Sequence, residues 1–554
     1  MSGGSPQKKL IFMINGTEVA YLKDRGVFRI AFFTGIIMLL TQIQLPAQDN
    51  PGPKGPYGGT LVWGVCQKPV AINPLLTTQT VSAAIVQLVF NSLVRINCQG
   101  EIAPDLAYSW DISPDGLVYT FYLRKGVRFH DGQELTAEDV KFTFDKIMDP
   151  EIRSPFRSAY EPVEDFKAAG KYAFQVRLKK PYAAFLYRMV RYIIPKHILE
   201  GNSHPIGSGP FKFKQWTKDG RIILEYNQDY YEGRPCLDRI EVKVYANSRD
   251  IWVAFMRQEV DFVLFIEHED YEIVKNDPAF KAYAFAIDHY YALVYNLEDS
   301  FLADIKVREA IAYGVDQEGL IERAGFGSGL ECLGPFYPQS LGFNPEVKPF
   351  EYNPQKAKEL LIQAGFRDLN NDGILEKEGE ELAVKVLIDS RNAIYKRIAM
   401  VLRQQLQEIG IKIKIAVYDN NSLLNREYIT KEKIQAHLTL LFGGLDPEQE
   451  SGIWSYTRKK EDNRLWPYKN EEVERLFVLG EGVLENKDRK EIYQRIHKII
   501  YQEQPVCFLY YPFVFHALSN KFANAEGFFT LNMPHYTMKD WHVKTDSTKK
   551  GGER

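Results

Sequence analysis

The sequence predicts an α/β protein built from several structural units, with added β-rich parts. The chain has 554 residues, which is too long for one hydrophobic core and indicates about three or four units. Residues 381–417 follow a strand, helix, strand pattern, which is typical of parallel strands joined by a right-handed crossover. Residues 116–132 and 209–226 alternate as antiparallel strands do, around turns at 125–126 and 219–220.

The first 47 residues are expected to be an export signal or an N-terminal anchor. Lys23, Arg25 and Arg29 precede the apolar run Ile30–Leu40, and a small residue, Ala47, follows. The run is shorter than the roughly 20 apolar residues of a spanning helix, which favours cleavage near Ala47 over a retained anchor. Residues 48–59 are a Pro/Gly-rich linker, and residues 546–554 form a polar tail.

Composition limits the classes of partner and site. The formal net charge is -3, so the basic excess that neutralises phosphates is missing and no nucleic-acid partner is expected. The five cysteines are far apart and include no C-x-x-C pair, which argues against a clustered metal site. Export permits one or two disulfides, and buried free thiols are the alternative.

Two helices have clear sequence boundaries. In LTAEDVKFTFDKIMDP, Thr136 is the expected N-cap with Asp139 three residues on, and Pro150 ends the helix. In NPQKAKELLIQAG, Asn353 is the expected N-cap, a proline takes the first helical position, and Gly365 occupies the left-handed position after the last turn.

The strand, helix, strand unit follows directly. Residues 381–389 read as a buried strand and residues 411–417 as an alternating one. Between them, apolar residues recur at helical spacing from Ile394 to Ile409 and stop at Gly410.

The stretch DLNNDGILEKEG opens like a calcium-binding loop. Asp368, Asn370 and Asp372 take its first three ligand positions, but the twelfth position is Gly379 and a strand follows where a helix is required. A surface turn is therefore the expected structure, with a looser calcium loop as the alternative. No other metal site and no cofactor are expected.

The sequence lacks two common catalytic motifs. The chain contains neither G-x-S-x-G nor H-E-x-x-H, and His130 precedes an Asp-Gly turn in which hydrogen bonding within the turn is its expected role. We therefore expect no catalytic residues, although triads assembled in space leave no local pattern.

The stretch Asp105–Pro150, beginning DLAYSWDISPDGLVYTFYLRKGVRFHDG, closely resembles bacterial extracellular solute-binding proteins of family 5, the peptide- and nickel-binding components of ABC importers. Further matches follow in the same order, at residues 205–213, 224–244, 295–321 and 352–366. The resemblance implies two lobes of the periplasmic-binding-protein type that close over a solute. It implies lobe I at 60–99, 206–295 and 505–545, its β-rich subdomain at 100–205, and lobe II at 296–504, with crossings near Asn296 and Gln504–Tyr511.

The resemblance also implies which residues meet the solute. In peptide-binding members an Asp four residues before the Pro of a cleft loop pairs with the α-ammonium of the peptide, and here that position is Gly443. Either Asp446 substitutes for it, or the solute lacks a free amino terminus. The substrate-binding candidates are Thr78, Thr80, Leu441, Gly443, Gly444, Asp446, Tyr510 and Tyr511. The two tyrosines are equally compatible with the core.

The sequence thus predicts a periplasmic, monomeric, non-catalytic protein that captures a peptide or peptide-like solute and delivers it to the permease of an ABC importer. Three alternatives stay open. They are a binding protein for an oligosaccharide or a nickel chelate, a receptor for signalling, and a two-lobed secreted hydrolase.

Overall fold

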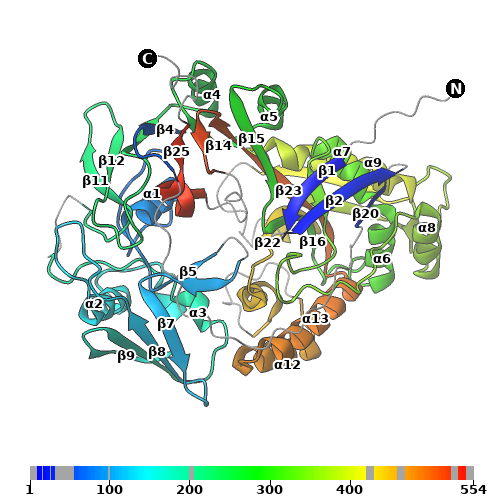
Figure 1. Cartoon of the computed structure of the whole chain (residues 1–554). Helices are drawn as coiled ribbons and strands as arrows, with labels where there is room; N and C mark the ends of the chain where they lie inside the picture. Colours follow the sequence, from blue (N-terminus) through cyan, green and yellow to red (C-terminus); the bar gives the residue numbers. More distant parts are fainter. Residues whose placement is uncertain are drawn as a thin grey trace.

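One twelve-stranded mixed sheet forms the centre of the protein (Figure 1). The structure is a computed structural model that describes residues 9–14, 17–24, 27–30, 55–97, 100–198, 205–418, 430–457, 468–525 and 534–544. The sheet order is β11-β12-β13-β4-β14-β23-β16-β22-β20-β21, and β15 and β17 also pair with β23. The strands are β4 (Thr60–Val65), β11 (Phe211–Trp216), β12 (Ile222–Tyr226), β13 (Arg239–Val244), β14 (Phe262–Ile266), β15 (Phe280–Ala286), β16 (His289–Tyr295), β17 (Gly329–Glu331), β20 (Ala383–Asp389), β21 (Lys412–Tyr418), β22 (Ala436–Phe442) and β23 (Val506–Ser519).

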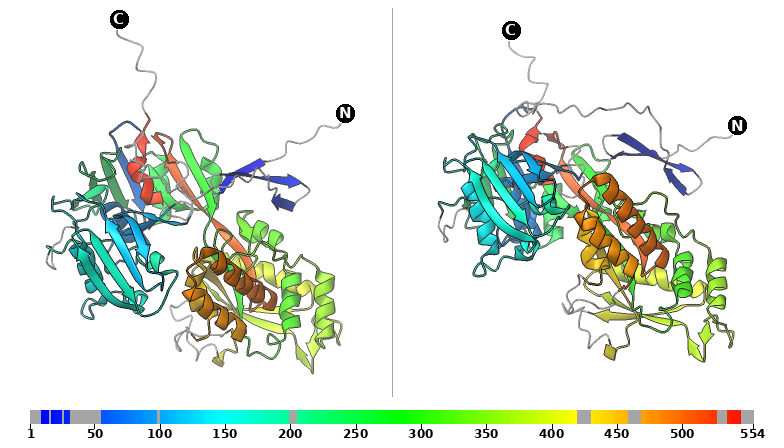
Figure 2. Two further views of the ribbon diagram at one scale, coloured as in Figure 1. Left: turned by 60° about the horizontal axis from the view of Figure 1, so that its bottom comes forward. Right: turned by 90° about the horizontal axis from the view of Figure 1, so that it is seen from below.

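Strand β23 belongs to both lobes. Its first half pairs with β16, and its second half pairs with β14 and β15, all antiparallel. Figure 2 shows this orange-red strand running from one lobe into the other. Ile287–Asp288 connects β15 to β16, and β23 continues from the pairing with β16 to the pairing with β14 and β15. The lobe crossing expected near Asn296 stays a prediction.

The first lobe packs helices on its half of the sheet. These are α1 (Thr80–Val89), α4 (Ser248–Met256) and α5 (His268–Val274), together with the C-terminal elements β24 (Phe522–Ala523), η5 (Pro534–Asp540) and β25 (His542–Val543). Trp63, Phe262 and Trp541 are buried in its core, with the Phe262 ring centroid 5.4 Å from that of Trp541.

A separate four-stranded sheet forms the subdomain, in the order β7-β8-β10-β9. Its elements are β7 (Ala107–Ile112), β8 (Val118–Leu123), α2 (Ala137–Met148), η1 (Arg157–Tyr160), β9 (Val163–Gly170), β10 (Ala173–Leu178) and α3 (Phe185–Arg188), with β5 (Val94–Ile96) and β6 (Ile102–Pro104) paired beside it. Helix α2 covers the sheet through Phe144, whose ring stacks on Phe166 and Phe174. Its predicted capping box of Thr136 and Asp139 is confirmed.

The second lobe contains the predicted parallel unit. Strands β20 and β21 pair in parallel on either side of α9 (Ala393–Glu408), so this prediction is confirmed. The expected N-cap of α8 is also confirmed, because the side chain of Asn353 accepts from Lys356 N–H. The lobe further contains α6 (Ile305–Gly314), α7 (Gln317–Ala324), α8 (Pro354–Gln363), β18 (Glu376–Lys377), β19 (Glu380–Glu381), η2 (Pro447–Glu450), α11 (Ser451–Trp454), α12 (Glu471–Gly482) and α13 (Asn486–Glu503).

The antiparallel prediction is confirmed at 209–226, where β11 and β12 pair, and partly wrong at 116–132. Strand β8 pairs with β7 and β10, and no strand follows the turn at Gly126. Val127 and Phe129 are buried in the subdomain core while their backbones bond to residues 133–135 in a tight loop. Val127 and Phe129 are therefore buried alternately without belonging to a β-sheet strand.

The described N-terminal residues form a small antiparallel sheet of β1 (Lys9–Ile14), β2 (Thr17–Asp24) and β3 (Val27–Ile30), drawn in dark blue in Figure 2. The rest of the predicted apolar run lies outside the described residues, as does Cys98. Among the described residues, we found no helix with the length and apolar character needed to span a bilayer. The cysteines at 66, 236, 332 and 507 are free thiols.

Candidate functional site

The two lobes touch at two places along their boundary. The backbone N–H of Ala183 in the subdomain donates to the carbonyl of Glu481 in α12, and Lys180 Nζ lies 3.0 Å from the Glu481 carboxylate. At a second contact, Ser328 of the second lobe lies 3.2 Å from His268 Nδ1, and the His268 ring stacks on Phe326.

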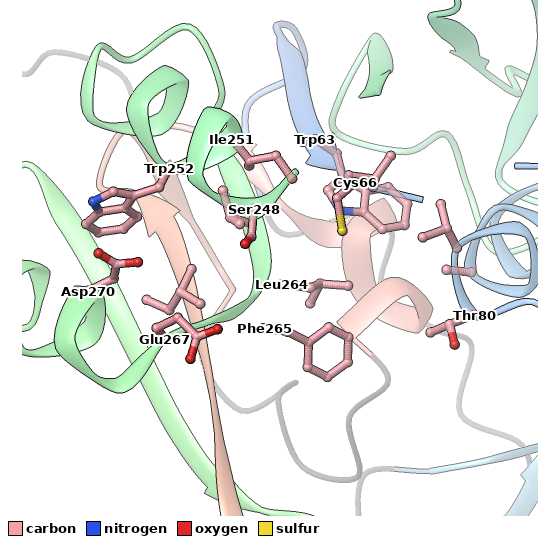
Figure 3. Close-up of a pocket in the computed structure, with 16 residues that line it drawn as sticks. Trp63, Cys66, Thr80, Ser248, Ile251, Trp252, Leu264, Phe265, Glu267 and Asp270 are labelled. Carbon is pink, nitrogen blue, oxygen red and sulfur yellow. The ribbon is translucent and has the colours of Figure 1, made fainter. Parts of the chain in front are cut away.

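A cavity of about 110 Å³ opens in the first lobe next to this boundary (Figure 3). It lies where β4 and β14 end and α1 begins, and parallel strands of α/β sheets commonly bind ligands at their carboxyl ends. Most of its lining is apolar, and the oxygen atoms come from a few side chains. The lining includes Trp63, Cys66, Thr80, Ala84, Ser248, Ile251, Trp252, Phe265, Glu267 and Asp270.

Phe265 is held in an unusual conformation at this cavity. Its φ is 57°, a left-handed value that is rare for an aromatic residue, and β14 is irregular in its pairing with β23 at this point. The backbone N–H of Phe265 donates to His516 Nδ1 over 3.2 Å, and the ring remains 44 % exposed. Backbone strain that keeps an aromatic ring in solvent beside a cavity is typical of ligand sites.

The charged groups of the cavity are acidic. Partial burial raises the pKa of Asp270, and Arg249, 3.9 Å away, opposes that shift. Glu267 is exposed at the beginning of α5. The cavity can therefore hold an apolar group whose end is polar or positively charged.

The loop after β22 forms the corresponding part of the second lobe. Gly443 N–H donates to the carbonyl of Asp288 over 2.6 Å, and Gly443 accepts from Tyr337 N–H over 3.0 Å. These bonds tie the loop to the crossing at Asp288. Leu441, within β22, pairs with Tyr290 of β16.

The structure separates the sequence-predicted residues into two groups. Thr78 and Thr80 are exposed at the beginning of α1, and Thr80 lines the cavity. Tyr510 and Tyr511 are each 1 % exposed, and their rings pack in the core against Tyr291 and Tyr290 respectively.

Asp446 is buried and paired within the protein. Its two carboxylate oxygens accept from the Arg489 guanidinium over 2.9 and 3.0 Å, and it also caps η2 through Glu448 N–H. Both oxygens are therefore engaged by groups of the second lobe itself. The sequence could not show this pair because Arg489 lies 43 residues further along the chain.

The calcium-like loop has the hydrogen bonds of a turn. Asp368 accepts from Gly373 N–H, Asn370 from Asp372 N–H, and Asp372 from Ile374 N–H. The predicted first three ligands are thus used to fold the loop. Within the described part of the chain, no three His, Cys, Asp or Glu side chains are grouped as metal ligands would be.

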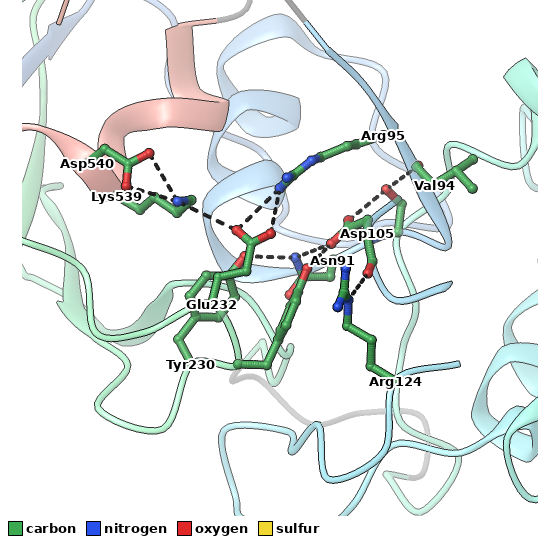
Figure 4. Close-up of polar contacts among 11 residues, drawn as sticks. Asn91, Val94, Arg95, Asp105, Arg124, Tyr230, Glu232, Lys539 and Asp540 are labelled. Atoms are coloured by element: carbon green, nitrogen blue, oxygen red, sulfur yellow. Dashed lines mark hydrogen bonds and ion pairs between the residues drawn. The ribbon is translucent and has the colours of Figure 1, made fainter. Parts of the chain in front are cut away.

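A polar network fixes the subdomain to the first lobe (Figure 4). Asp105 is buried and accepts from Ser92 N–H, the Asn91 amide and the Tyr231 hydroxyl. Burial raises the pKa of Asp105, and the charge of Arg95 opposes that shift. Asp105, the first residue of the stretch that resembles family 5, therefore has a structural role in joining these parts.

Sequence reasoning missed Phe265, Glu267 and Asp288 at the lobe boundary and Glu450, which is buried behind it. Phe265 depends on a strained φ that no composition pattern reveals. The others come from loops or short elements that only the fold brings to the boundary.

Comparison with known proteins agrees with this architecture. Residues 101–464 match the family model described as "Bacterial extracellular solute-binding proteins, family 5 Middle". The chain is 31 % identical over 476 residues to the oligopeptide-binding protein AppA of Bacillus subtilis (strain 168), covering 83 % of this chain and 87 % of AppA.

Two solved structures are also similar. AppA from Bacillus subtilis in complex with a nonapeptide has a TM-score of 0.69 at 29 % identity, covering 89 % of this chain and 100 % of that chain. NikZ from Campylobacter jejuni in complex with Ni(L-His) has a TM-score of 0.72 at 26 % identity, covering 87 % and 99 %. With the family model matching more than half of its length, this chain belongs to the bacterial extracellular solute-binding proteins of family 5.

Proposed function

We propose that this chain is the substrate-binding component of an ABC importer, and that it captures a peptide or peptide-like solute and delivers it to a membrane permease. The observation that carries the proposal is the cavity at the ends of β4 and β14, which opens beside the contact between the lobes. Family membership supports solute binding, and the similarity to the oligopeptide-binding protein AppA favours peptides.

The chemistry of the cavity suits part of a peptide. Thr78 and Thr80 offer uncharged hydroxyl groups at the beginning of α1, which can hydrogen-bond a peptide backbone. The apolar lining suits a side chain. We assign the solute-facing role to these threonines and to Leu441, Gly443 and Gly444, and we assign supporting roles to Asp446, Tyr510 and Tyr511.

Capture would proceed by closure of the lobes about the crossing strands. A solute that contacts both lobes binds the closed form more tightly than the open form and thereby shifts the population towards it. We propose that the protein acts in this way as an exported periplasmic monomer, led out by residues 1–47, with no catalytic step of its own.

Native mass spectrometry of the exported protein from its own cells tests this function. A peptide released on denaturation supports the proposal, and an oligosaccharide or a metal chelate would contradict it. If the protein is empty, a thermal-shift screen of peptides, sugars and chelates decides the class.

A substitution tests the cavity itself. Ser248→Trp places an indole at the cavity from an exposed position on α4, so we expect solute affinity to fall about tenfold or more. Val253→Trp is the matched control, because Val253 is 39 % exposed on the same helix and does not line the cavity. Equal affinities for the two variants would contradict this site.

A further inference from the structure

Three acidic residues are buried in the short segment DPEQE, at positions 446, 448 and 450. Asp446 and Glu448 are each 3 % exposed, and Glu450 is fully buried. A buried carboxyl group is costly unless it is paired or hydrogen-bonded, so each of these groups requires a partner.

Two of the three have partners in the second lobe. Asp446 forms its two-bond pair with Arg489, and Glu448 accepts from the hydroxyl of Tyr493 over 2.5 Å. For Glu450, neither carboxyl oxygen forms a hydrogen bond of regular geometry with any residue that the structure describes. One acidic group in this segment is thus left unmatched.

Two further unmatched groups accompany Glu450. The hydroxyl of Tyr290 and the indole N–H of Trp454 are both buried, and neither forms a hydrogen bond of regular geometry with described residues. Burial and the nearby charge of Glu450 raise the pKa of Tyr290, and the indole N–H of Trp454 lowers the pKa of Glu450 as a hydrogen-bond donor does. The indole therefore offers this carboxyl a weak partner, and the Tyr290 hydroxyl lies within the electrostatic reach of Glu450. Unsatisfied polar groups that gather in one place indicate a missing partner such as a water, an ion or a ligand group.

The group lies directly behind the loop at the lobe boundary. A Cβ on Gly444 would lie 3.1 Å from Glu450 Oε1, so the carboxyl reaches the backbone of this loop only because residue 444 is glycine. The next residue, Leu445, meets the subdomain, since a Cβ on Gly100 would lie 3.2 Å from Leu445 Cδ2. Glu450 therefore sits one layer behind the surface that faces the first lobe.

We propose that Glu450, with Tyr290, Trp454 and the Gly443–Gly444 backbone, forms a buried site for a protonated amine of the solute. The inference rests on the proposed solute-binding function and deepens it. The carboxylate supplies the counter-charge and acceptor oxygens, the aromatic rings favour a cation, and Asp288 adds negative charge nearby. The Glu450 carboxylate would thus bind the amine, although residue 443 is a glycine and supplies no carboxylate.

Binding at this site would release a proton. Burial, reinforced by the charge of Asp288, raises the pKa of Glu450 well above its usual range, so the free protein keeps this carboxyl protonated to higher pH than an ordinary glutamate. An ammonium favours the ionised carboxylate, and the displaced proton passes to the buffer. Affinity for the amine then rises as the pH rises through the pKa that Glu450 has in the free protein, until the amine itself loses its proton.

Calorimetry with matched peptides tests the site. The probes are a nonapeptide library with free amino termini and the same library N-acetylated, each titrated in two buffers of different ionisation enthalpy. We expect the wild-type protein to prefer the free amine about tenfold or more and to release a proton on binding. Glu450→Gln should bind both libraries equally and release none. Glu450→Met is the second variant if the first fails to fold.

Glu448→Gln is the matched control, because it changes a buried acid of the same segment that already has its partner in Tyr493. It should keep both the preference and the proton release. If Glu450→Gln kept them as well, Glu450 would be a structural group satisfied by water, and the inference would be wrong.

A small probe separates this inference from the proposed function. Ethylammonium chloride should raise the Tm of the wild-type protein over a sodium chloride reference and leave that of Glu450→Gln unchanged. If no peptide binds but this Tm difference is seen, the amine site is supported and the proposed peptide transport is contradicted. If peptides bind without a preference for the free amine, peptide transport is supported and the amine site is contradicted. If neither probe binds, both proposals are contradicted.

Discussion

Asp446 shows how strongly one residue can depend on a distant partner. The Asp446 and Arg489 side chains are 3 % and 5 % exposed, so their ion pair is shielded from solvent. Asp446→Asn would leave the Arg489 charge buried without its counter-charge, and we expect a loss of about 3–5 kcal/mol in the free energy of unfolding. Urea denaturation of both proteins measures this change.

Asp145→Asn is the control for that prediction. Asp145 pairs with Lys141 one turn earlier on the exposed face of α2, and such pairs contribute about 0.3–0.5 kcal/mol. If Asp446→Asn were no more costly than this control, Asp446 would not be paired in solution. It would then be a candidate for binding the amino group of the solute, as the sequence first allowed.

Residue-scale predictions from sequence succeeded where the partner is local. Thr136 with Asp139 and Asn353 with Lys356 were predictable because a cap and its hydrogen-bond partner lie three residues apart. The roles of Asp446 and Glu450 were not predictable from sequence. Asp446 has a partner in α13, Arg489, and the Glu450 carboxyl has no hydrogen bond of regular geometry with described residues. That difference arises only when the second lobe folds.

At the scale of elements, α13 carries a buried titratable group that makes stability depend on pH. His497 is fully buried, its Nδ1 accepts from Asn344 N–H, and its Nε2 lies 2.6 Å from the carbonyl of Leu333. Burial lowers its pKa from 6.5 to about 4. Between these values the unfolded chain binds a proton that the folded chain excludes.

Stability therefore falls as the pH falls through this window. One such group contributes a slope of about 1.4 kcal/mol per pH unit. His497→Gln should reduce the slope of unfolding free energy against pH by about that amount between pH values near 4.5 and 6. Urea denaturation at a series of pH values measures it. Tyr501→Phe on the same helix should lower stability equally at each pH, and an unchanged slope for His497→Gln would contradict the assignment.

Elements were predictable when periodicity and boundary residues agreed. The unit of β20, α9 and β21 has both a clear period and glycine or asparagine at its ends, and it formed as expected. At 127–131 the alternation of Val127 and Phe129 was present, but the hydrogen bonds closed a local loop. Burial pattern alone does not determine which backbone groups pair.

At the scale of the whole molecule, the two-lobed architecture came from resemblance and not from residue patterns. Local patterns indicated α/β elements, but they carried no information on which lobe each segment joins. The lobes depend on β23, near the C-terminus, which pairs with β15 and β16, more than 200 residues earlier in the chain. The cavity is equally non-local, since its lining combines residues 63–84 with residues 248–270.

The ion pair between Lys180 and Glu481 joins the subdomain of the first lobe to α12 of the second lobe. Because this pair forms only when the lobes are in contact, it should bias them towards the closed form. Lys180 is 62 % exposed, and an exposed pair contributes only about 0.2–1 kcal/mol. Glu481→Lys replaces attraction with repulsion, which should shift the ratio of closed to open molecules about fivefold at low salt. Small-angle X-ray scattering without added solute should then give a larger radius of gyration than for the wild-type protein, and high salt should reduce the difference.

The charge-swapped double variant, Lys180→Glu with Glu481→Lys, should return to the wild-type radius of gyration. If it stays expanded, the ion pair does not control closure, and the backbone hydrogen bond from Ala183 to Glu481 is the part of this contact that matters.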